Sequence, residues 1–306
     1  MYIEGLKRIL ESEIQAPAPH LCIEYLASSR AYTVVTRVAS SSYNESIIRE
    51  TLDLSHILVE NEESSFVEDK RFADALIAFV TKISTSIPLQ VETGSSMLEV
   101  VFGIAATLRL QPKILPTWFR PDTRRSEDLT SVDSESGLNP RSPKHEFPLF
   151  YLLLDYMHHE GKVGDFARTG LLYIIEAATC SETLERWIVE SDLTTLMASG
   201  LGALYSQLSR YFSFKSHKSY ITKLYRKLVL SFPKDLVPAI VAFSEVARPQ
   251  SPPGAQMSAS EDFQAHLATF LSYLVFWQDI LEHCMSNDIK QSLLDHFEYL
   301  FLQQLL

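Results

Sequence analysis

Cysteine is scarce in this chain, and its three cysteines are far apart. Cys22, Cys180 and Cys284 are odd in number and share no short spacing, so neither a disulfide framework nor a cysteine-based metal site can be built from them. Each lies in an apolar segment of helical character. We therefore expect structural, buried thiols in a reducing compartment.

Glycine and proline are also sparse, with ten glycines and fourteen prolines in 306 residues. An all-β chain needs many tight turns, so this scarcity favours long helices instead. Prolines at 112, 116, 233 and 238 mark breaks or first turns of helices. Hydrophobic residues make up 46% of the chain, which is enough for a globular core.

The chain has no excess of positive charge. Its 27 Lys and Arg residues stand against 38 Asp and Glu residues, which gives a formal net charge of −11. Nucleic-acid binding depends on basic surface that neutralises phosphates, and the densest basic runs, at 124–125 and 215–218, are short. The sequence predicts no nucleic-acid partner.

The chain also shows no leader or long uncharged apolar run. Residues 1–15 have the pattern of an amphipathic helix. The longest apolar runs, Met97–Leu108 and Phe147–Leu154, are too short to span a bilayer, and Glu99 and Asp155 interrupt or end them. We expect a soluble, cytoplasmic protein without direct membrane insertion.

Apolar residues at helical spacing are what the sequence has in abundance. Three segments share one period: Phe72, Leu76, Phe79, Val80 and Ile83; Phe263, Leu267, Phe270, Leu271 and Leu274; and Ile289, Leu293, Phe297, Leu300 and Phe301. Ser258–Glu261 and Thr179–Glu182 have the form of capping boxes, and Asn287 and Asp165 are candidate N-caps.

These patterns predict an all-α fold, in the form of an α-solenoid of the armadillo/HEAT type. No sequence repeat recurs at a fixed period, and a helical bundle is the alternative. We expect one helical-repeat domain over 1–306, with a disordered insertion at 119–146 and a loop at 249–259. The apolar end at Leu300–Leu306 predicts either a longer protein or a helix that docks elsewhere.

One short segment groups several kinds of ionisable residue, namely Asp155, His158, His159 and Glu160. Adjacent histidines point about 100 degrees apart on a helix, which is unsuited to joint metal binding. We expect Asp155 to pair with His159 one turn away and the histidines to favour a helix C-terminus. A metal hydrolase using His158, His159 and Glu160 is the less favoured alternative.

The glycine pairs Gly161/Gly164 and Gly200/Gly202 do not match a phosphate-binding loop. We expect Gly161 to close one helix at its C′ position and Asp165 to cap the next. No GxSxG motif is present in the sequence. The sequence therefore predicts that the protein is not an enzyme.

The segment Phe147–Leu208 carries a resemblance to a known family. Three stretches hold the match: Met157–Ile175 (MHHEGKVGDFARTGLLYII), Trp187–Ser191 (WIVES) and Met197–Leu208 (MASGLGALYSQL). They resemble the signature region of the FTS- and Hook-interacting protein (FHIP) family, also described as the retinoic-acid-induced-16-like domain, in its N-terminal portion. Family members are usually much longer than this chain.

The resemblance implies an adaptor subunit of the FTS–Hook–FHIP (FHF) complex. The implied partners are the FTS protein, the C-terminal region of Hook and an early-endosomal Rab GTPase, with Hook activating dynein and dynactin. The resemblance implies that the protein uses no cofactor. It also implies a cytoplasmic protein that is held at early endosomes through its partners. The alternative, from another class, is a Rab GTPase effector or exchange module acting outside that complex.

Candidate partner-binding residues come from the region of resemblance: Lys162, Asp165, Arg168, Trp187 and Tyr205. Tryptophan and tyrosine often anchor interfaces, but at helical spacing we favour packing between helices. For Arg168 we favour a structural pairing with Asp165 or Glu160. The helix that carries Arg168 should have a core face made of Ala167, Gly170, Leu171, Ile174, Ile175 and Ala178.

Overall fold

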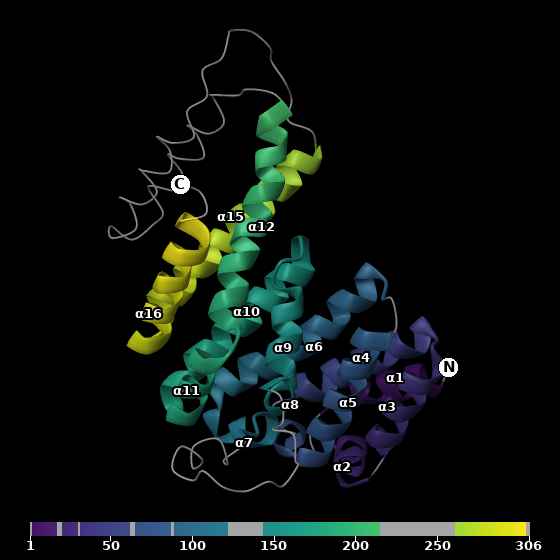
Figure 1. The fold of residues 1–306 in the computed structure, drawn as a ribbon. Coiled ribbons are helices and arrows are strands. Elements are labelled where there is room, and N and C mark those ends of the chain that lie inside the picture. The colour runs from purple at the N-terminus through teal and green to yellow at the C-terminus, as the bar shows by residue number, and fades with distance from the viewer. Residues whose placement is uncertain are drawn as a thin grey trace, which may run out of the picture. The chain divides into compact units, whose positions relative to one another are not determined.

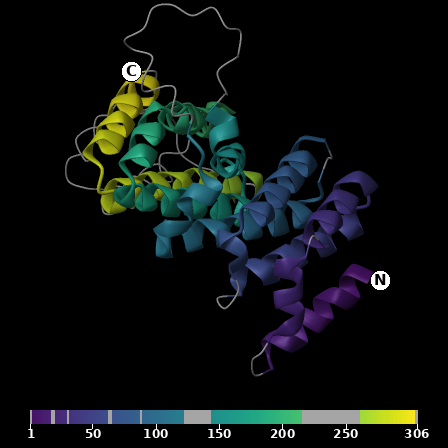
Figure 2. The ribbon, with the colours of Figure 1, turned by 90° about the horizontal axis from the view of Figure 1, so that it is seen from below.

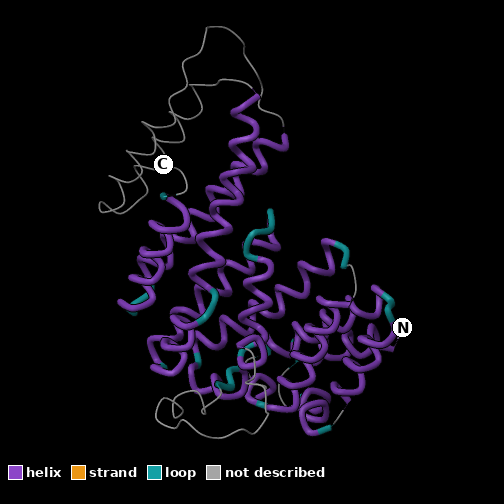
Figure 3. The backbone as a smooth tube through the Cα atoms, viewed as in Figure 1, coloured by secondary structure: helices purple, strands orange, loops and turns teal. Residues whose placement is uncertain are grey.

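The structure is a computed structural model that describes residues 2–16, 20–29, 31–61, 65–86, 89–121, 143–214 and 261–303. Every regular element within these ranges is a helix, and none is a strand (Figures 1 and 3). The all-α prediction is therefore confirmed, while the solenoid arrangement stays a prediction. The predicted loop at 249–259 and residues 122–142 of the predicted insertion lie outside the described residues.

The described chain divides into two compact units. Unit 1 comprises Met1–Met157 and Lys162–Leu184, and unit 2 comprises His158–Gly161 and Glu185–Leu306. We expected one domain over 1–306. Each unit is described here by itself.

Unit 1 is built from helices that pack on their next-but-one neighbours. In chain order its elements are α1 (Tyr2–Ile14), α2 (Leu21–Ser28), α3 (Ala31–Ser42), α4 (Glu45–Glu60), η1 (Ser65–Glu68), α5 (Lys70–Ser86), α6 (Val91–Leu110), η2 (Pro112–Ile114), α7 (Leu115–Trp118), α8 (Pro143–Glu146), α9 (Pro148–Tyr156), α10 (Gly161–Ala177) and η4 (Ala178–Cys180). The most extensive contacts join α4 to α6 and α3 to α5, and Figure 2 shows these helices side by side. Stacked helix pairs produce this pattern.

Helix α6 supplies much of the core of unit 1. Met97, Leu98, Val100, Val101, Ile104, Ala105 and Leu108 are all buried. By length and composition α6 would suffice to cross a membrane, although half of the relevant window is buried inside the protein. Our expectation that no apolar run reaches that length is therefore wrong, because α6 extends beyond both ends of the apolar run that we considered.

The phenylalanine periodicity of α5 predicts its buried face correctly. Phe72, Leu76, Phe79, Val80 and Ile83 are each at most 4% exposed. The ring centroid of Phe72 lies 4.6 Å from that of Tyr32 on α3, and aromatic contacts of this kind add to the burial of apolar area. The α5 stripe thus forms the contact with α3.

The ends of the predicted insertion belong to the fold. Phe119 is 4% exposed and Glu146 is 2% exposed. The amide of Arg120 donates a hydrogen bond to the carbonyl of Glu146 over 3.0 Å. The described ends of the predicted insertion therefore lie next to each other in unit 1.

Unit 2 contains the last part of α11 (Glu182–Glu190), then α12 (Leu193–Phe214), α15 (Glu261–His283), α16 (Asn287–His296) and the π-helical segment η5 (Phe297–Leu302). Helix α12 packs against α15, α16 and η5. Tyr273 of α15 is fully buried, and its hydroxyl donates to the carbonyl of Met197 on α12 over 3.3 Å.

The π segment keeps an aromatic stripe in register. Ile289, Leu293, Phe297 and Phe301 are buried at every fourth position. Four residues of an α-helix overshoot one turn by about 40 degrees, so this spacing would drift around a regular helix. The wider π turn offsets the drift, and Phe301 reaches Tyr205 with a centroid distance of 6.2 Å.

Two predicted N-caps are displaced by one or two residues. The hydroxyl of Ser181, and not that of Thr179, accepts from the third amide of α11, because the Thr179 hydroxyl donates back to its own helix. Ser286, and not Asn287, caps α16 in the same way. The other predicted capping box, Ser258–Glu261, lies mostly outside the described part of the chain.

The prediction of buried thiols holds for one cysteine. Cys284 is buried, Cys22 is half-buried and Cys180 is exposed. Cys180 is the last residue of the 3₁₀ turn η4, at the connection to α11.

Candidate functional site

The junction between α9 and α10 gathers three of the candidate residues, all in unit 1. Arg168 is buried; its Nη2 donates to Oδ1 of Asp165 over 2.7 Å, and its Nη1 donates to the carbonyl of Met157 over 2.8 Å. A buried arginine needs such partners, because an unpaired charge in the interior is costly. Arg168 therefore has the structural role that we favoured, and it ties α10 to the end of α9.

Helix α10 begins earlier than expected. Gly161, with φ of +64°, is its first residue, so Gly161 does not close a helix and Asp165 does not cap one. The two predictions are wrong because α9 already ends at Tyr156 and Asp165 lies inside α10. Lys162 and Asp165 are exposed near this helix N-terminus, and their role in partner binding stays a prediction.

The predicted core face of α10 is confirmed. Its members are Ala167, Gly170, Leu171, Ile174, Ile175 and Ala178, and all of them are buried. A β-carbon at Gly170 would lie 3.1 Å from Cδ1 of Leu153 on α9. Glycine at this position therefore lets the two helices approach closely.

The two aromatic candidates belong to unit 2 and are packed within the protein. Trp187 is 6% exposed. Tyr205 is half-buried between Phe270 and Phe301, with centroid distances of 6.4 and 6.2 Å. Burial raises the pKa of the Tyr205 hydroxyl above its usual value. These contacts match the packing between helices that we favoured for both.

The side chains of the histidine segment do not converge on one point among the described residues. The ring of His158 lies directly against Gly200, where a β-carbon would be 1.9 Å from its Cε1, and 5.1 Å from the ring centroid of Tyr273. His159 is exposed, and Glu160 pairs with Nδ1 of His266 over 2.9 Å. Among the described residues, these three side chains contact different neighbours.

The predicted pairing of Asp155 with His159 is wrong. Helix α9 ends at Tyr156, so the two residues are not one helical turn apart. Asp155 instead pairs with Lys144 of α8, at a distance of 3.3 Å from Nζ to Oδ2.

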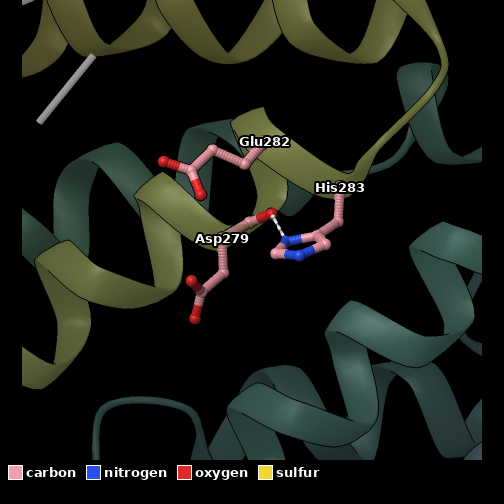
Figure 4. A group of neighbouring side chains, drawn as sticks. All are labelled: Asp279, Glu282 and His283. Carbon is pink, nitrogen blue, oxygen red and sulfur yellow. Dashed lines mark hydrogen bonds between the residues drawn. The ribbon is translucent and has the colours of Figure 1, made fainter.

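A different acid–histidine group ends α15. Asp279, Glu282 and His283 bring one potential ligand atom each to within 4.8 Å of one another, and Figure 4 shows them on the last turn of the helix. Nδ1 of His283 lies 2.9 Å from the carbonyl oxygen of Asp279, and burial raises the pKa of the Asp279 carboxyl. The three residues lie at positions i, i+3 and i+4 of one helix, and this spacing in the sequence could have indicated the group. We assign it no metal, because two of the three side chains are exposed.

The clefts on the described surface of unit 1 include two that are assembled from several helices. One, of about 690 Å³, lies among α5, α7, α8 and α9 and is bordered by the ion pairs Asp74–Arg120 and Lys144–Asp155. The other, of about 900 Å³, lies among α4, α6, the two 3₁₀ turns η1 and η2, and Phe166 of α10. No sequence motif marked either cleft, since each is assembled from distant segments.

Within the ranges that the structure describes, the protein is all-helical. Its clustered ionisable residues pair mainly with one another. The chain belongs to the family described as Retinoic acid induced 16-like protein, whose model matches residues 22–306. This confirms the family that the sequence resemblance indicated.

The curated relatives are similar at about one residue in four. An FHIP family protein of Nematostella vectensis is 25% identical over 229 residues, which cover 74% of this chain and 24% of the relative. An FHIP family protein of Drosophila mojavensis is 26% identical over 65% of this chain and 19% of its own length. The FHF complex subunit HOOK-interacting protein 1B of Homo sapiens is 25% identical over 53% of this chain and 15% of its own length. The chain thus spans less than a quarter of the length of these relatives.

Proposed function

We propose that this chain acts as a noncatalytic adaptor subunit of an FTS–Hook–FHIP complex and binds the C-terminal region of Hook. The observation that carries the proposal is the family match over residues 22–306, together with relatives named as HOOK-interacting subunits of the FHF complex in human, mouse and rat. We also propose that the chain binds FTS, the further subunit that the family resemblance implies.

Charged residues that pair across neighbouring helices give this proposal physical support. Arg109 of α6 pairs with Glu176 of α10, and its guanidinium also lies 4.7 Å from the ring centroid of Tyr173. Arg168 and His266 join neighbouring segments in the same manner. Side chains engaged in this way position helices and their surfaces, which is what a scaffold requires.

The finer proposal concerns cellular context. The adaptor would link early endosomes to dynein and dynactin through Hook, and reach the endosome through a Rab GTPase. It would then be a cytoplasmic protein, peripheral to the membrane.

The test is direct binding with purified proteins. We expect the chain to co-elute in size-exclusion chromatography with the C-terminal region of Hook, with FTS, or with both together, and not with the remainder of Hook. Absence of binding to Hook and FTS, singly and combined, would refute the proposal. A chain that instead binds an early-endosomal Rab in a nucleotide-dependent way, or speeds nucleotide release, would belong to the alternative class.

A further inference from the structure

The larger of the two clefts described above runs along one face of α6. We define the α4–α6 groove by its lining: His56, Val59, Glu60, Asn61, Val67, Glu68, Glu99, Phe102, Gly103, Ala106, Thr107, Leu110, Gln111, Lys113, Ile114 and Phe166. The α6 members, from Glu99 to Leu110, follow one helical face. Eleven steps at 1.5 Å make this stripe about 16 Å long, or three turns of a helix lying beside it.

Apolar side chains of α6 form part of the floor of the groove. Large side chains stand at its two ends, since Phe102 contacts the ring of Phe166 at 5.4 Å and Leu110 is 78% exposed. Between them lie the small residues Gly103 and Ala106. Small residues flanked by large ones leave room for side chains of a partner helix, which is the usual geometry of helix-in-groove recognition.

The position of α6 beside α4 fixes this floor. A β-carbon at Gly103 would lie only 3.1 Å from Cγ1 of Val59 on α4, so glycine permits the close approach of the two helices. Val59 is 6% exposed and Ile114, below the other end, is 2% exposed. The floor therefore rests on the core of unit 1.

The rim of the groove is acidic. Glu60 and Glu99 face each other across His56, whose Nδ1 and Nε2 lie 3.3 and 3.9 Å from their carboxylates. Glu68 is paired with Lys113 over 2.7 Å. The rim thus carries three carboxylates, one ammonium group and the imidazole of His56, on a chain of net charge −11, and such a rim attracts a basic partner.

From these features we infer that the α4–α6 groove binds an amphipathic helix of about three turns, whose apolar stripe is flanked by Lys or Arg. Apolar anchors at i, i+3, i+4 and i+7 enter between Phe102 and Leu110. The basic flanks face Glu60 and Glu99. This inference goes beyond the proposed adaptor function, because it does not depend on which protein supplies the helix.

The probe is a fluorescein-labelled synthetic helix of about 18 residues, with leucines at the anchor spacing and lysines on both flanks, measured by fluorescence anisotropy. A twin peptide has glutamates in place of the lysines. The lysine peptide should bind the wild-type chain and the glutamate twin should not. Because the probe is synthetic, its result does not bear on binding to Hook or FTS.

Variants then locate the binding. Glu60→Gln with Glu99→Gln should weaken the lysine peptide about three- to tenfold, as expected for two exposed ion pairs. Ala106→Arg should block the floor and remove binding while circular dichroism shows the helices intact. The double variant Glu24→Gln with Glu190→Gln, at exposed positions outside the groove lining, changes the net charge equally and should bind like the wild type.

Several results would overturn the inference. These are equal binding of both peptides, no binding by the wild type, and groove variants that bind like the charge-matched control. A chain that dimerises in sedimentation velocity, and becomes monomeric on Ala106→Arg, would assign the groove to a second copy instead. Should Ala106→Arg misfold, the glutamine pair still decides the question.

Discussion

Replacing Gly200 by alanine should reveal how firmly the segment at 158–161 is seated on α12. The new β-carbon would lie 1.9 Å from Cε1 of His158, 2.6 Å from its Nδ1 and 2.7 Å from its Nε2. Carbon atoms that are not bonded approach to about 3.5 Å, so the imidazole must leave its place beside Tyr273. Such overpacking costs about 1–3 kcal/mol.

The helix itself would favour the same change. Alanine is better than glycine in a helix interior by about 1 kcal/mol, which offsets part of the clash. The informative quantity is therefore the coupling between the two positions. In a His158→Ala background the clash is gone, and Gly200→Ala should stabilise the protein by about 1 kcal/mol.

Gly202 offers a matched control on the same helix. A β-carbon there would meet nothing within 4 Å, so Gly202→Ala should stabilise the protein in both backgrounds by about 1 kcal/mol at most. The assay is urea unfolding followed by circular dichroism and tryptophan fluorescence, whose transitions must coincide before free energies are compared. The described packing of the His158 ring against Gly200 would be refuted by either of two results. Gly200→Ala could change the unfolding free energy as Gly202→Ala does, or its effect could be the same with and without His158→Ala.

Three further predictions concern unit 1. Leu171→Asp should unfold or aggregate the protein, because an unpaired carboxylate at a position with 0% exposure costs several kcal/mol; a soluble monomer with a wild-type melting curve would contradict this. Arg168→Met should lower the unfolding free energy by about 1–3 kcal/mol, since the Met157 carbonyl loses its donor, and unchanged urea unfolding would refute that role. The carboxylate of Glu13 accepts hydrogen bonds from two backbone amides at the start of α2, which lowers its pKa. Its stabilising effect is therefore fully present above the ordinary pKa of 4.5. The effect is lost as the pH falls through the lowered pKa. The melting temperatures of wild type and Glu13→Gln should therefore differ at pH 7 and converge in acid, and a constant difference would exclude this linkage.

Local periodicity determined what could be predicted about the fold. The buried faces of α5 and α10 were predictable because a stripe such as that of Leu171 and Ile175 can be hidden in only one way on a helix. Helix starts were less certain. Thr179 and Ser181 both offer a capping hydroxyl, and only the extension of the preceding helix into a 3₁₀ turn decides between them.

Contacts between distant segments could not be predicted in this way. The position of His158 against Gly200 joins residues that no motif connects, and a histidine next to a glycine-containing helix has many other arrangements. The α4–α6 groove likewise draws Glu60, Glu99 and Phe166 from three helices. Such assemblies depend on how helices stack, which a single sequence does not specify.

The wider turn at Phe297–Leu302 has a consequence for the number of residues that this part of the chain can hold. Its last bond runs from the amide of Gln303 to the carbonyl of Glu298, five residues back, so the segment contains more residues per turn than an ordinary coil. Deleting one residue there would let an ordinary α-helix form with nearly the same total rotation. The wider turn thus accommodates one residue more than an α-helix that rotates by the same angle.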